Sequence, residues 1–392
     1  MGKHCPEPEL IKCLYSNLQS FVNKRDEIVL RISENDYDLL FFTEIWIGDQ
    51  HHESELHLPG FQKLIVDPQV HGGACIFVRS GIDFTVVKPP QAMNESVWLC
   101  VNTKDNVRRL YSCVYRSPNS VAENNENLLL NIKWACENFT ETIIVGDFNA
   151  PSINWEIEYS PDNYAQNMID VANDCALEQI IDKETRFRDG QLPSLLDLVF
   201  VNRPEIVNCV RYCDPFGKSD HITICFDLKN SKCTKNDKIA KLNYRKIDQR
   251  KFEEKMMSRD WKTLFTNENI NLAYRQFISL VKNAIADCVL LYRKQDIKKA
   301  PWATQRLRRL SVKKRQKWDK YRLSRSNNYY NEYRQCLNEF TEEKKLAILK
   351  YENQIIADKS SNPKKYHIYV SKKKKYNENK ITRMRSRQRM LP

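Results

Sequence analysis

Short apolar runs that end on a polar residue or a turn recur along the first 230 residues. In the clearest example, the apolar and β-branched residues 142–145 are followed by Gly146, Asp147 and Asn149. Such a run predicts a buried strand that ends in a tight turn, where the ordinary role of Asp147 is to bond the turn's own backbone. Comparable strands are predicted at 10–15, 38–44, 71–78, 97–101, 110–115, 194–201 and 219–226.

Helical periodicity appears between several of these strands. Apolar residues recur at helical spacing in 24–34, 123–138 and 164–176. Short strands interleaved with two or three helices over this length are typical of an α/β sandwich, in which two packed sheets are flanked by helices. Because the polar residues named below fall at strand ends or turns, we expect them to gather at one rim of the sandwich.

The pattern changes after residue 230, where Lys, Arg, Asn and Tyr dominate. An amphipathic helix is predicted at 272–292, and helices at 307–321 and 330–355 carry an apolar and aromatic stripe. We expect the last two to pack as a hairpin with basic outer faces, their aromatic residues forming a core or, alternatively, a platform for stacked bases. The chain thus divides into a sandwich domain, a basic helical region and a basic tail expected to be disordered, at 1–230, 231–370 and 371–392.

Charge separates the two halves of the chain. Residues 1–230 hold 20 basic and 34 acidic residues, a net charge of −14, whereas residues 231–392 hold 43 basic and 16 acidic residues, a net charge of +27. An acidic body joined to a strongly basic arm indicates a catalytic or metal-binding domain with a region that binds a polyanion. The alternative for the basic half is a set of solvated helix faces.

Cysteine usage and hydropathy bear on the compartment. The 13 cysteines include no Cys-x-x-Cys pair, which favours reduced thiols and argues against a zinc site. No apolar signal segment follows Met1, and no run approaches the length of a transmembrane helix, so we expect an intracellular protein with no membrane partner. The basic run 372–375 is a candidate nuclear address, although such runs are often only solvated.

One carboxylate is set inside an apolar strand. Asp197 stands within the run 195–200 and should be largely buried. Because an unpaired buried carboxylate is costly, Asp197 requires a donor. His221 is the candidate, since a carboxylate at its Nδ1 would fix the tautomer and stabilise the imidazolium. The alternative is that Asp197 accepts backbone N–H bonds at a bulge.

Other polar residues at strand ends have the chemistry of a metal and phosphate site. Glu44 and Asp220 offer hard oxygen ligands of the kind that Mg²⁺ prefers. Asn17, Tyr115 and Asn149 are neutral donors suited to phosphate oxygens. Taken singly, each of these residues is more often an ordinary turn or surface residue, so the interpretation depends on the whole set.

Seven blocks in order along the chain match a known pattern: Asn17, Phe42-Thr43-Glu44, Gly72-Gly73, Tyr115-Arg116-Ser117-Pro118-Asn119, Gly146-Asp147-Phe148-Asn149, Ser194-Leu195-Leu196-Asp197 and Ser219-Asp220-His221. Through them, residues 10–228 resemble the endonuclease/exonuclease/phosphatase superfamily, in the version at the front of non-LTR (LINE-type) retrotransposon polyproteins. Residues 151–155 look like the Jockey-type branch, and the second half resembles the basic linker that precedes the polymerase there.

The resemblance implies a DNase I-like fold and a role for each site residue. Glu44, Asn17 and Asp220 would hold Mg²⁺ or Mn²⁺ against the scissile phosphate of DNA. Asp147 would orient or deprotonate the attacking water. The phosphate and its developing charge would be met by Asn149, Tyr115 and His221, with His221 held by Asp197.

The implied reaction is hydrolysis of one DNA strand that leaves a 3′-hydroxyl, usable as a primer, and a 5′-phosphate. No polymerase block is present in the sequence, so no reverse transcriptase activity is expected. The basic region would bind DNA, or RNA, through its phosphates. Two alternatives stay open: an abasic-site repair nuclease or other phosphoesterase of the same fold, and a nucleic-acid-binding protein that has lost catalysis.

Overall fold

The chain folds into two compact units, one of residues 1–234 with 297–392 and one of residues 235–296. Each unit is described by itself. The computed structural model describes residues 10–47, 53–65, 72–93, 95–102, 107–229, 242–247, 249–258, 261, 270–291, 300–367 and 369.

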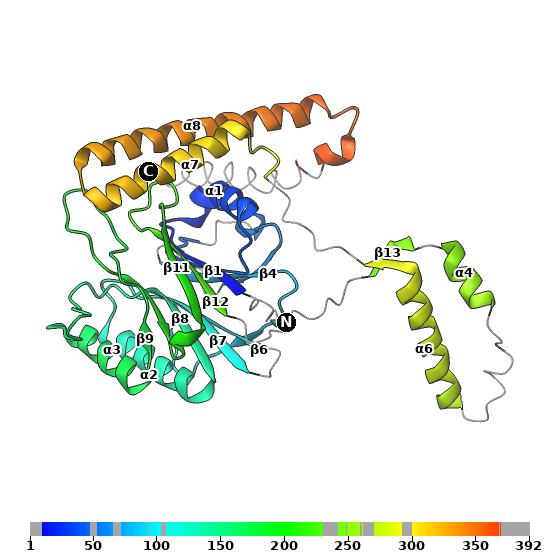
Figure 1. Cartoon of the computed structure of the whole chain (residues 1–392), viewed down its shortest axis with the longest axis horizontal. Helices are drawn as coiled ribbons and strands as arrows, with labels where there is room; N and C mark the ends of the chain where they lie inside the picture. Colours follow the sequence, from blue (N-terminus) through cyan, green and yellow to red (C-terminus); the bar gives the residue numbers. More distant parts are fainter. Residues whose placement is uncertain are drawn as a thin grey trace, which may run out of the picture. The chain divides into compact units, whose positions relative to one another are not determined.

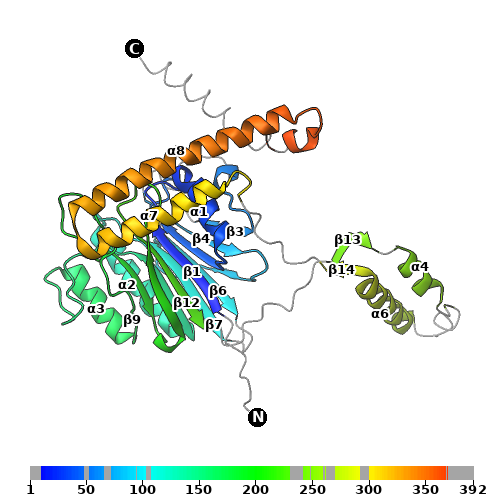
Figure 2. The ribbon, with the colours of Figure 1, turned by 45° about the horizontal axis from the view of Figure 1, so that its top comes forward.

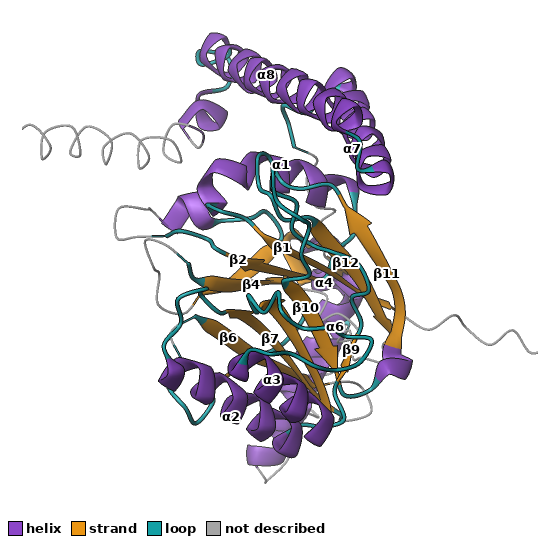
Figure 3. Cartoon of the chain, turned by 90° about the vertical axis from the view of Figure 1, so that its left-hand side faces the viewer, coloured by secondary structure: helices purple, strands orange, loops and turns teal. Residues whose placement is uncertain are grey.

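The larger unit is built around two mixed sheets of six strands each (Figure 3). The first sheet has the order β11 (Val207–Cys213), β12 (Thr223–Lys229), β1 (Leu10–Asn17), β2 (Leu39–Thr43), β4 (Ala74–Arg79) and β3 (Phe61–Ile65). The second has the order β5 (Thr85–Val87), β6 (Ser96–Asn102), β7 (Arg108–Tyr115), β8 (Glu141–Asp147), β10 (Asp197–Val201) and β9 (Glu178–Gln179). The predicted two-sheet α/β sandwich is confirmed.

Strand direction determines which residues reach the rim of each sheet. β1 runs parallel to β2, and β7 runs parallel to β8, so the carboxyl ends of each pair lie together. β12 is antiparallel to β1, and β10 is antiparallel to β8, so these two strands begin where their neighbours end. In the second sheet, the register places Asp147 opposite both Tyr115 and Asp197.

Apolar residues fill the layer between the sheets and cover both outer faces. Ile143 and Val145 of β8 pack between the sheets, whereas Ile144 packs outward. Burial on both faces explains why the central strands read as continuous apolar runs. The outer face of the first sheet packs on α1 (Phe21–Glu34), and that of the second on α2 (Ala122–Asn138) and α3 (Asn163–Asp174) (Figure 3).

Within the two six-stranded sheets, the sequence pattern missed four strands, β3, β5, β9 and β11, and these are the four edge strands. An edge strand packs on fewer neighbours, so its sequence needs less apolar character. β9 has only two residues, and β11 is nowhere fully buried. Two short 3₁₀ helices were also not predicted, η1 (Glu53–Leu56) and η2 (Pro204–Ile206).

Two long helices complete the larger unit. α7 (Gln305–Ser324) is capped by the side chain of Thr304, and α8 (Asn327–Ala357) follows after a short turn. The two helices lie side by side (Figures 1 and 2), which confirms the predicted hairpin. Tyr333 and Phe340 of the aromatic stripe are buried, so these rings form core and are not available to stack on bases.

The predicted division at residue 230 stays a prediction. The compact units divide the chain differently, because α7 and α8 belong to the same unit as the sandwich. The predicted tail at 371–392 lies outside the described residues.

In its described residues, the smaller unit has an antiparallel pair of strands and two helices. It contains β13 (Leu242–Ile247), α4 (Gln249–Met257), α6 (Ile270–Cys288) and β14 (Val289–Leu291), with β13 paired to β14. The predicted helix at 272–292 is wrong in its last turn, because the apolar run that follows Cys288 pairs with β13 instead. Among the helices that the structure describes, none has the length and apolar character needed to cross a membrane.

Candidate active site

Three polar side chains meet at the rim of the sandwich. Asn17 is the last residue of β1, Glu44 follows β2 directly, and Asp147 is the last residue of β8. Nδ2 of Asn17 donates to Glu44 Oε1 at 2.8 Å and to Asp147 Oδ2 at 2.9 Å. Because these bonds join the two sheets, the rims of both sheets coincide, and the predicted gathering of strand-end residues is present.

The backbone next to this cluster adopts conformations that are rare for L-residues. Glu44 has a φ of 48° and Asn149 a φ of 46°, both in the left-handed region. The carbonyl of Glu44 accepts from Ser20 N at 2.8 Å, and Asn149 N donates to Asp147 Oδ1 at 3.1 Å. Strained backbone of this kind persists only where the surrounding structure holds it, and it is concentrated at functional sites.

Asp197 and His221 form a buried pair beside the cluster. The structure places His221 Nδ1 2.8 Å from Asp197 Oδ2, and both side chains are at most 3% exposed. Tyr15 OH donates to Asp197 Oδ1 at 2.6 Å, while the N–H of Asp197 donates to Thr185 Oγ1 at 3.0 Å. The predicted contact between Asp197 and His221 is therefore present, and it leaves Nε2 as the remaining nitrogen of the imidazole.

One set of ligand atoms is compact enough for a metal ion. Atoms of Glu44, Asp147 and His221 lie within 4.8 Å of one another. In the same cluster, Oδ1 of Asn17 is buried and has no hydrogen-bond partner among the described residues. A carboxamide oxygen without a donor, next to two carboxylates, is a hard oxygen set of the kind that suits Mg²⁺ or Mn²⁺. The residues present therefore fit the predicted cation.

Asp220, the third predicted ligand, is engaged by other side chains. Its Oδ1 accepts from Gln19 Nε2 at 2.6 Å, and its Oδ2 pairs with Arg186 Nε at 3.1 Å. Oδ1 also lies 3.8 Å from His221 Nε2. Asp220 is thus outside the compact set of ligand atoms, and its role as a metal ligand stays a prediction.

Tyr115 and Asn149 lie on the adjoining strand ends. Burial, with the carboxylates of Glu44 and Asp147 nearby, raises the pKa of Tyr115, so its hydroxyl is a neutral donor. One amide hydrogen of Asn149 is used by the turn, because Nδ2 donates to the carbonyl of Arg116 at 2.7 Å. Contacts of Tyr115 and Asn149 with a phosphate stay predictions.

The first glycine of the Gly72-Gly73 block is favoured by its backbone conformation and by close packing. Gly72 has a φ of +90°, and a Cβ atom there would lie 2.3 Å from Glu95 Oε1 and 3.0 Å from Tyr115 Cε1. A larger residue would therefore displace two side chains at the rim. Glu95, which the sequence did not single out, joins the acidic surroundings of Tyr115.

Burial and charge raise the pKa values of two groups of the site above neutrality. Burial, with the charges of Asp197 and Glu44, raises the pKa of Asp147 to about 8, against the opposing effects of His221 and Asn17. Burial alone would lower the pKa of His221, but Asp197 and then Asp147 and Asp220 raise it to about 9. A cation placed among these carboxylates would favour their charged forms.

Several residues that support the site were missed from the sequence. Tyr15 and Thr185 hold Asp197, and Gln19 and Arg186 hold Asp220. Tyr15 reads as an ordinary apolar position of β1, and Arg186 lies in a stretch without any periodic pattern. The sequence contains no pattern that would have identified either residue, because their partners lie far away along the chain.

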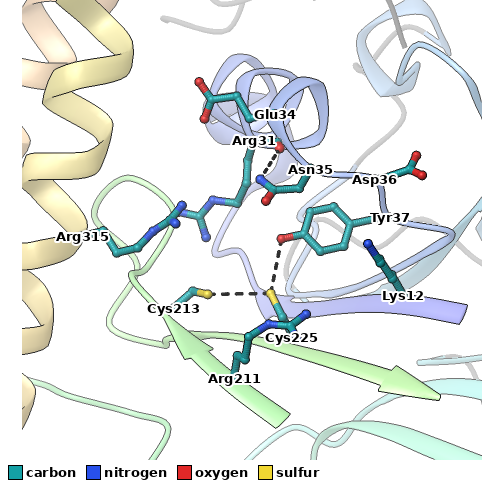
Figure 4. Close-up of a pocket in the computed structure, with 10 residues that line it drawn as sticks. All are labelled: Lys12, Arg31, Glu34, Asn35, Asp36, Tyr37, Arg211, Cys213, Cys225 and Arg315. Atoms are coloured by element: carbon teal, nitrogen blue, oxygen red, sulfur yellow. Dashed lines mark hydrogen bonds between the residues drawn. The ribbon is translucent and has the colours of Figure 1, made fainter. Parts of the chain in front are cut away.

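A cavity of about 320 Å³ lies apart from these residues, against the outer face of the first sheet (Figure 4). The sulfur atoms of its lining residues Cys213 and Cys225 lie 3.8 Å apart, and Tyr37 OH lies 3.4 Å from the Cys225 sulfur. Its basic lining side chains are Lys12, Arg31, Arg211 and Arg315. None of the predicted site residues lines it.

A comparison with known protein families shows which kind of domain the sandwich resembles. Residues 110–225, from β7 into β12, match the family described as endonuclease–reverse transcriptase. No curated protein sequence matches the chain. The match includes the segments that carry Asp147, Asp197 and His221, so it bears out the predicted resemblance of the sandwich to the endonuclease/exonuclease/phosphatase superfamily.

Similar solved structures include three nucleic-acid enzymes. The endonuclease domain of TRAS1, a telomere-specific non-LTR retrotransposon, is 17% identical with a TM-score of 0.46, over 57% of this chain and 100% of that one. The 3′ phosphatase NExo from Neisseria, bound to a product DNA hairpin, is 14% identical with a TM-score of 0.45, over 56% and 99%. The AP endonuclease LMAP from Leishmania major is 12% identical with a TM-score of 0.47, over 57% and 89%. Similarity at this level assigns no activity to this chain.

Proposed function

We propose that this protein is a divalent-metal-dependent endonuclease that nicks one strand of DNA. The observation that carries the proposal is the meeting of Asn17, Glu44 and Asp147 beside the Asp197–His221 pair. Two carboxylates, an unpaired carboxamide oxygen and a buried imidazole are together suited to holding a cation against a phosphate and to stabilising its developing charge.

In the proposed reaction, the side chains of the site have separate roles. Glu44 and Asn17 would hold the cation, which when bound would supply positive charge beside the phosphate oxygens and the attacking water. Asp147 accepts the proton of the attacking water. His221 donates from Nε2 to a phosphate oxygen as an imidazolium, which Asp197 stabilises at Nδ1.

The products and the biological role are parts of the same proposal. Hydrolysis breaks the bond between phosphorus and the 3′ oxygen, leaving a 3′-hydroxyl and a 5′-phosphate. The match of residues 110–225 to an endonuclease–reverse transcriptase family supports a role in retrotransposition, where the 3′-hydroxyl would prime reverse transcription. The basic region would contact the phosphates of DNA, or of RNA, in a salt-dependent way.

A plasmid-nicking assay tests the proposal. Supercoiled plasmid is incubated with the full chain and Mg²⁺, in parallel with EDTA and with the variants His221→Ala and Glu44→Gln. We expect nicked circles with the native chain, none with EDTA, and rates reduced about 10²-fold or more in both variants. Asp170→Asn, an exposed carboxylate on α3, is the matched control and should nick at the native rate.

Other outcomes would select other functions. Plasmid retardation without nicking, weakening as salt rises, would indicate a nucleic-acid-binding protein that has lost catalysis. Cleavage of an abasic oligonucleotide much faster than of intact DNA would indicate a repair nuclease. Nicking that survives EDTA would contradict the metal-dependent mechanism.

A further inference from the structure

On one side, the segment 184–188 is hydrogen-bonded to Asp197 and to the residues around His221. Thr185 Oγ1 accepts from the N–H of Asp197 at 3.0 Å, and Thr185 O accepts from Ile222 N at 2.8 Å. Arg186 forms a backbone bridge with His221, and Phe187 N donates to the carbonyl of Asp220 at 2.7 Å. The Arg186 side chain also pairs with Asp220. The position of His221 therefore depends on this segment.

On its other side, the same segment packs against the end of α7. The ring of Phe187 is 5% exposed and meets Trp318 edge-on, with ring centroids 5.4 Å apart. Tyr321 lies 6.3 Å from the same ring, and the guanidinium of Arg325 lies 4.6 Å from its centroid. Arg325 also pairs with Glu184 at 3.0 Å. Phe187 is thus enclosed by residues from the end of α7.

α7 is itself fixed to the sandwich and to α8. Lys314 is 1% exposed and pairs with Glu27 of α1 and with Asp214, the latter at 3.0 Å. One turn later, Trp318 packs on Tyr333 of α8 with ring centroids 4.9 Å apart. The aromatic contacts to Phe187 therefore come from a helix whose position is determined by buried contacts.

We propose that Trp318, Tyr321 and Arg325 are positioning residues for the endonuclease, acting through Phe187 and segment 184–188 on Asp220 and His221. The inference rests on the proposed function and deepens it, because it makes the basic helix part of the nuclease. None of these α7 side chains touches the reacting atoms. Their effect is to hold the imidazole where the phosphate will lie, and a displacement of about 1 Å at such a site can cost about 10²-fold in rate.

Trp318→Ala tests the proposal, because it removes the packing on Phe187 without removing a charge that could bind DNA. In the full chain, we expect kcat for plasmid nicking to fall about tenfold or more while KM changes less than about threefold. Hydrogen exchange of the amides of Phe187 and Ile222 should become faster, since both depend on the segment. Trp318→Phe should recover most of the native kcat.

Leu307→Ala is the matched control on the same helix. Leu307 is fully buried but packs near Leu30 and Phe340, away from segment 184–188. We expect this variant to lose stability yet keep the native kcat and the native exchange of Phe187 and Ile222. Equal losses of kcat in Leu307→Ala and Trp318→Ala would mean that general destabilisation, and not positioning, is responsible.

The two measurements also separate this inference from the proposed function. If the native chain does not nick DNA, the endonuclease proposal fails, whereas hydrogen exchange still tests whether α7 holds the segment. If Trp318→Ala does not fold, Phe187→Leu removes the same ring contact from the opposite side. Native kcat and native exchange in either folded variant would overturn the inference.

Discussion

At the scale of single residues, the Asp197–His221 contact determines the charge at the centre of the site. Burial alone would lower the pKa of His221, but the carboxylate of Asp197, 2.8 Å from Nδ1, together with Asp147 and Asp220 raises it to about 9. Its imidazole is therefore cationic at neutral pH. In Asp197→Asn we expect that pKa to fall by more than one unit, because the nearest negative charge is removed while burial remains.

The measurement is an NMR titration of the His221 ring protons in metal-free protein, native against Asp197→Asn. Nicking should fall about 10²-fold or more at pH 7, because the neutral ring is a weaker donor to the phosphate. Asp170→Asn serves as the control for the loss of one negative charge. A His221 titration that is unchanged in Asp197→Asn would show that another group sets its charge.

A second residue-scale prediction concerns the cavity of Figure 4. A hydrogen bond from the Cys225 thiol lowers the pKa of Cys213 to about 7; burial opposes this effect, and the guanidinium groups of Arg31 and Arg315 support it. Because the thiolate is the reactive form, we expect Cys213 to be alkylated by iodoacetamide at pH 7.5 faster than the other cysteines that the structure describes.

Mass spectrometry of peptides after timed alkylation measures this rate. Cys225→Ala removes the hydrogen-bond donor and should slow the alkylation of Cys213 severalfold. Cys209, on the same strand β11 and also partly exposed, provides an internal comparison. Equal alkylation of Cys209 and Cys213 would show that the neighbouring groups do not activate Cys213.

At the scale of elements, a buried charge cluster joins α7 to the sandwich. Lys314 and its partner Asp214 are each 1% exposed, and Lys314 also pairs with Glu27. Lys314→Met leaves two buried carboxylates without this cation, so we expect the free energy of unfolding to fall by about 3–5 kcal/mol. Lys313→Met, at the exposed neighbour that pairs with Glu339, should cost less than about 1 kcal/mol.

Urea unfolding of the two variants tests the prediction directly. A loss below about 1 kcal/mol for Lys314→Met would show that the buried cluster does not stabilise the docking of α7.

The same cluster gives the fold an acid dependence. Burial alone would raise the pKa of Asp214, but Arg31 and Lys314 lower it to about 2. The unfolded value is about 3.9, so this carboxylate stabilises the folded chain by about 2–3 kcal/mol above pH ~4. That stability is lost as the pH falls from about 4 through about 2. Unfolding curves across this range should show the loss in the native chain and less of it in Asp214→Asn.

Whether a strand could be predicted from the sequence depends on whether both of its faces are buried. Central strands such as β8 are buried on both faces and read as apolar runs, whereas the four edge strands do not. The contact of Asp197 with His221 could be predicted because a carboxylate in such a run needs a partner. The bonds of Tyr15 to Asp197 and of Gln19 to Asp220 could not, since residues 182 and 201 positions apart meet only through strand order.

At the scale of the whole molecule, the basic half divides between the two compact units. α7 contacts the sandwich through Lys314 and Trp318 and packs against α8, whereas residues 235–296 form a unit of their own. The strong positive charge of residues 231–392 suggests a single basic arm. It could not show that α7 and α8 belong to the unit of the sandwich, because net charge carries no information about which helices pack there.

Two shortened chains test this division. A chain in which a Gly/Ser linker replaces 235–296 should keep the Tm of the larger unit, since that unit retains its own contacts. A chain that ends at residue 230 loses Lys314 and Arg315 beside Asp214 together with the α7 packing of Phe187, so we expect its Tm to fall by about 10 °C or more. Calorimetry measures the Tm of each shortened chain. If the chain ending at residue 230 melts at the native temperature, α7 does not stabilise the sandwich. The positioning role of Trp318 depends on its packing against Phe187, whose segment is bonded to Asp220 and His221. That result would therefore also remove the physical basis for this role.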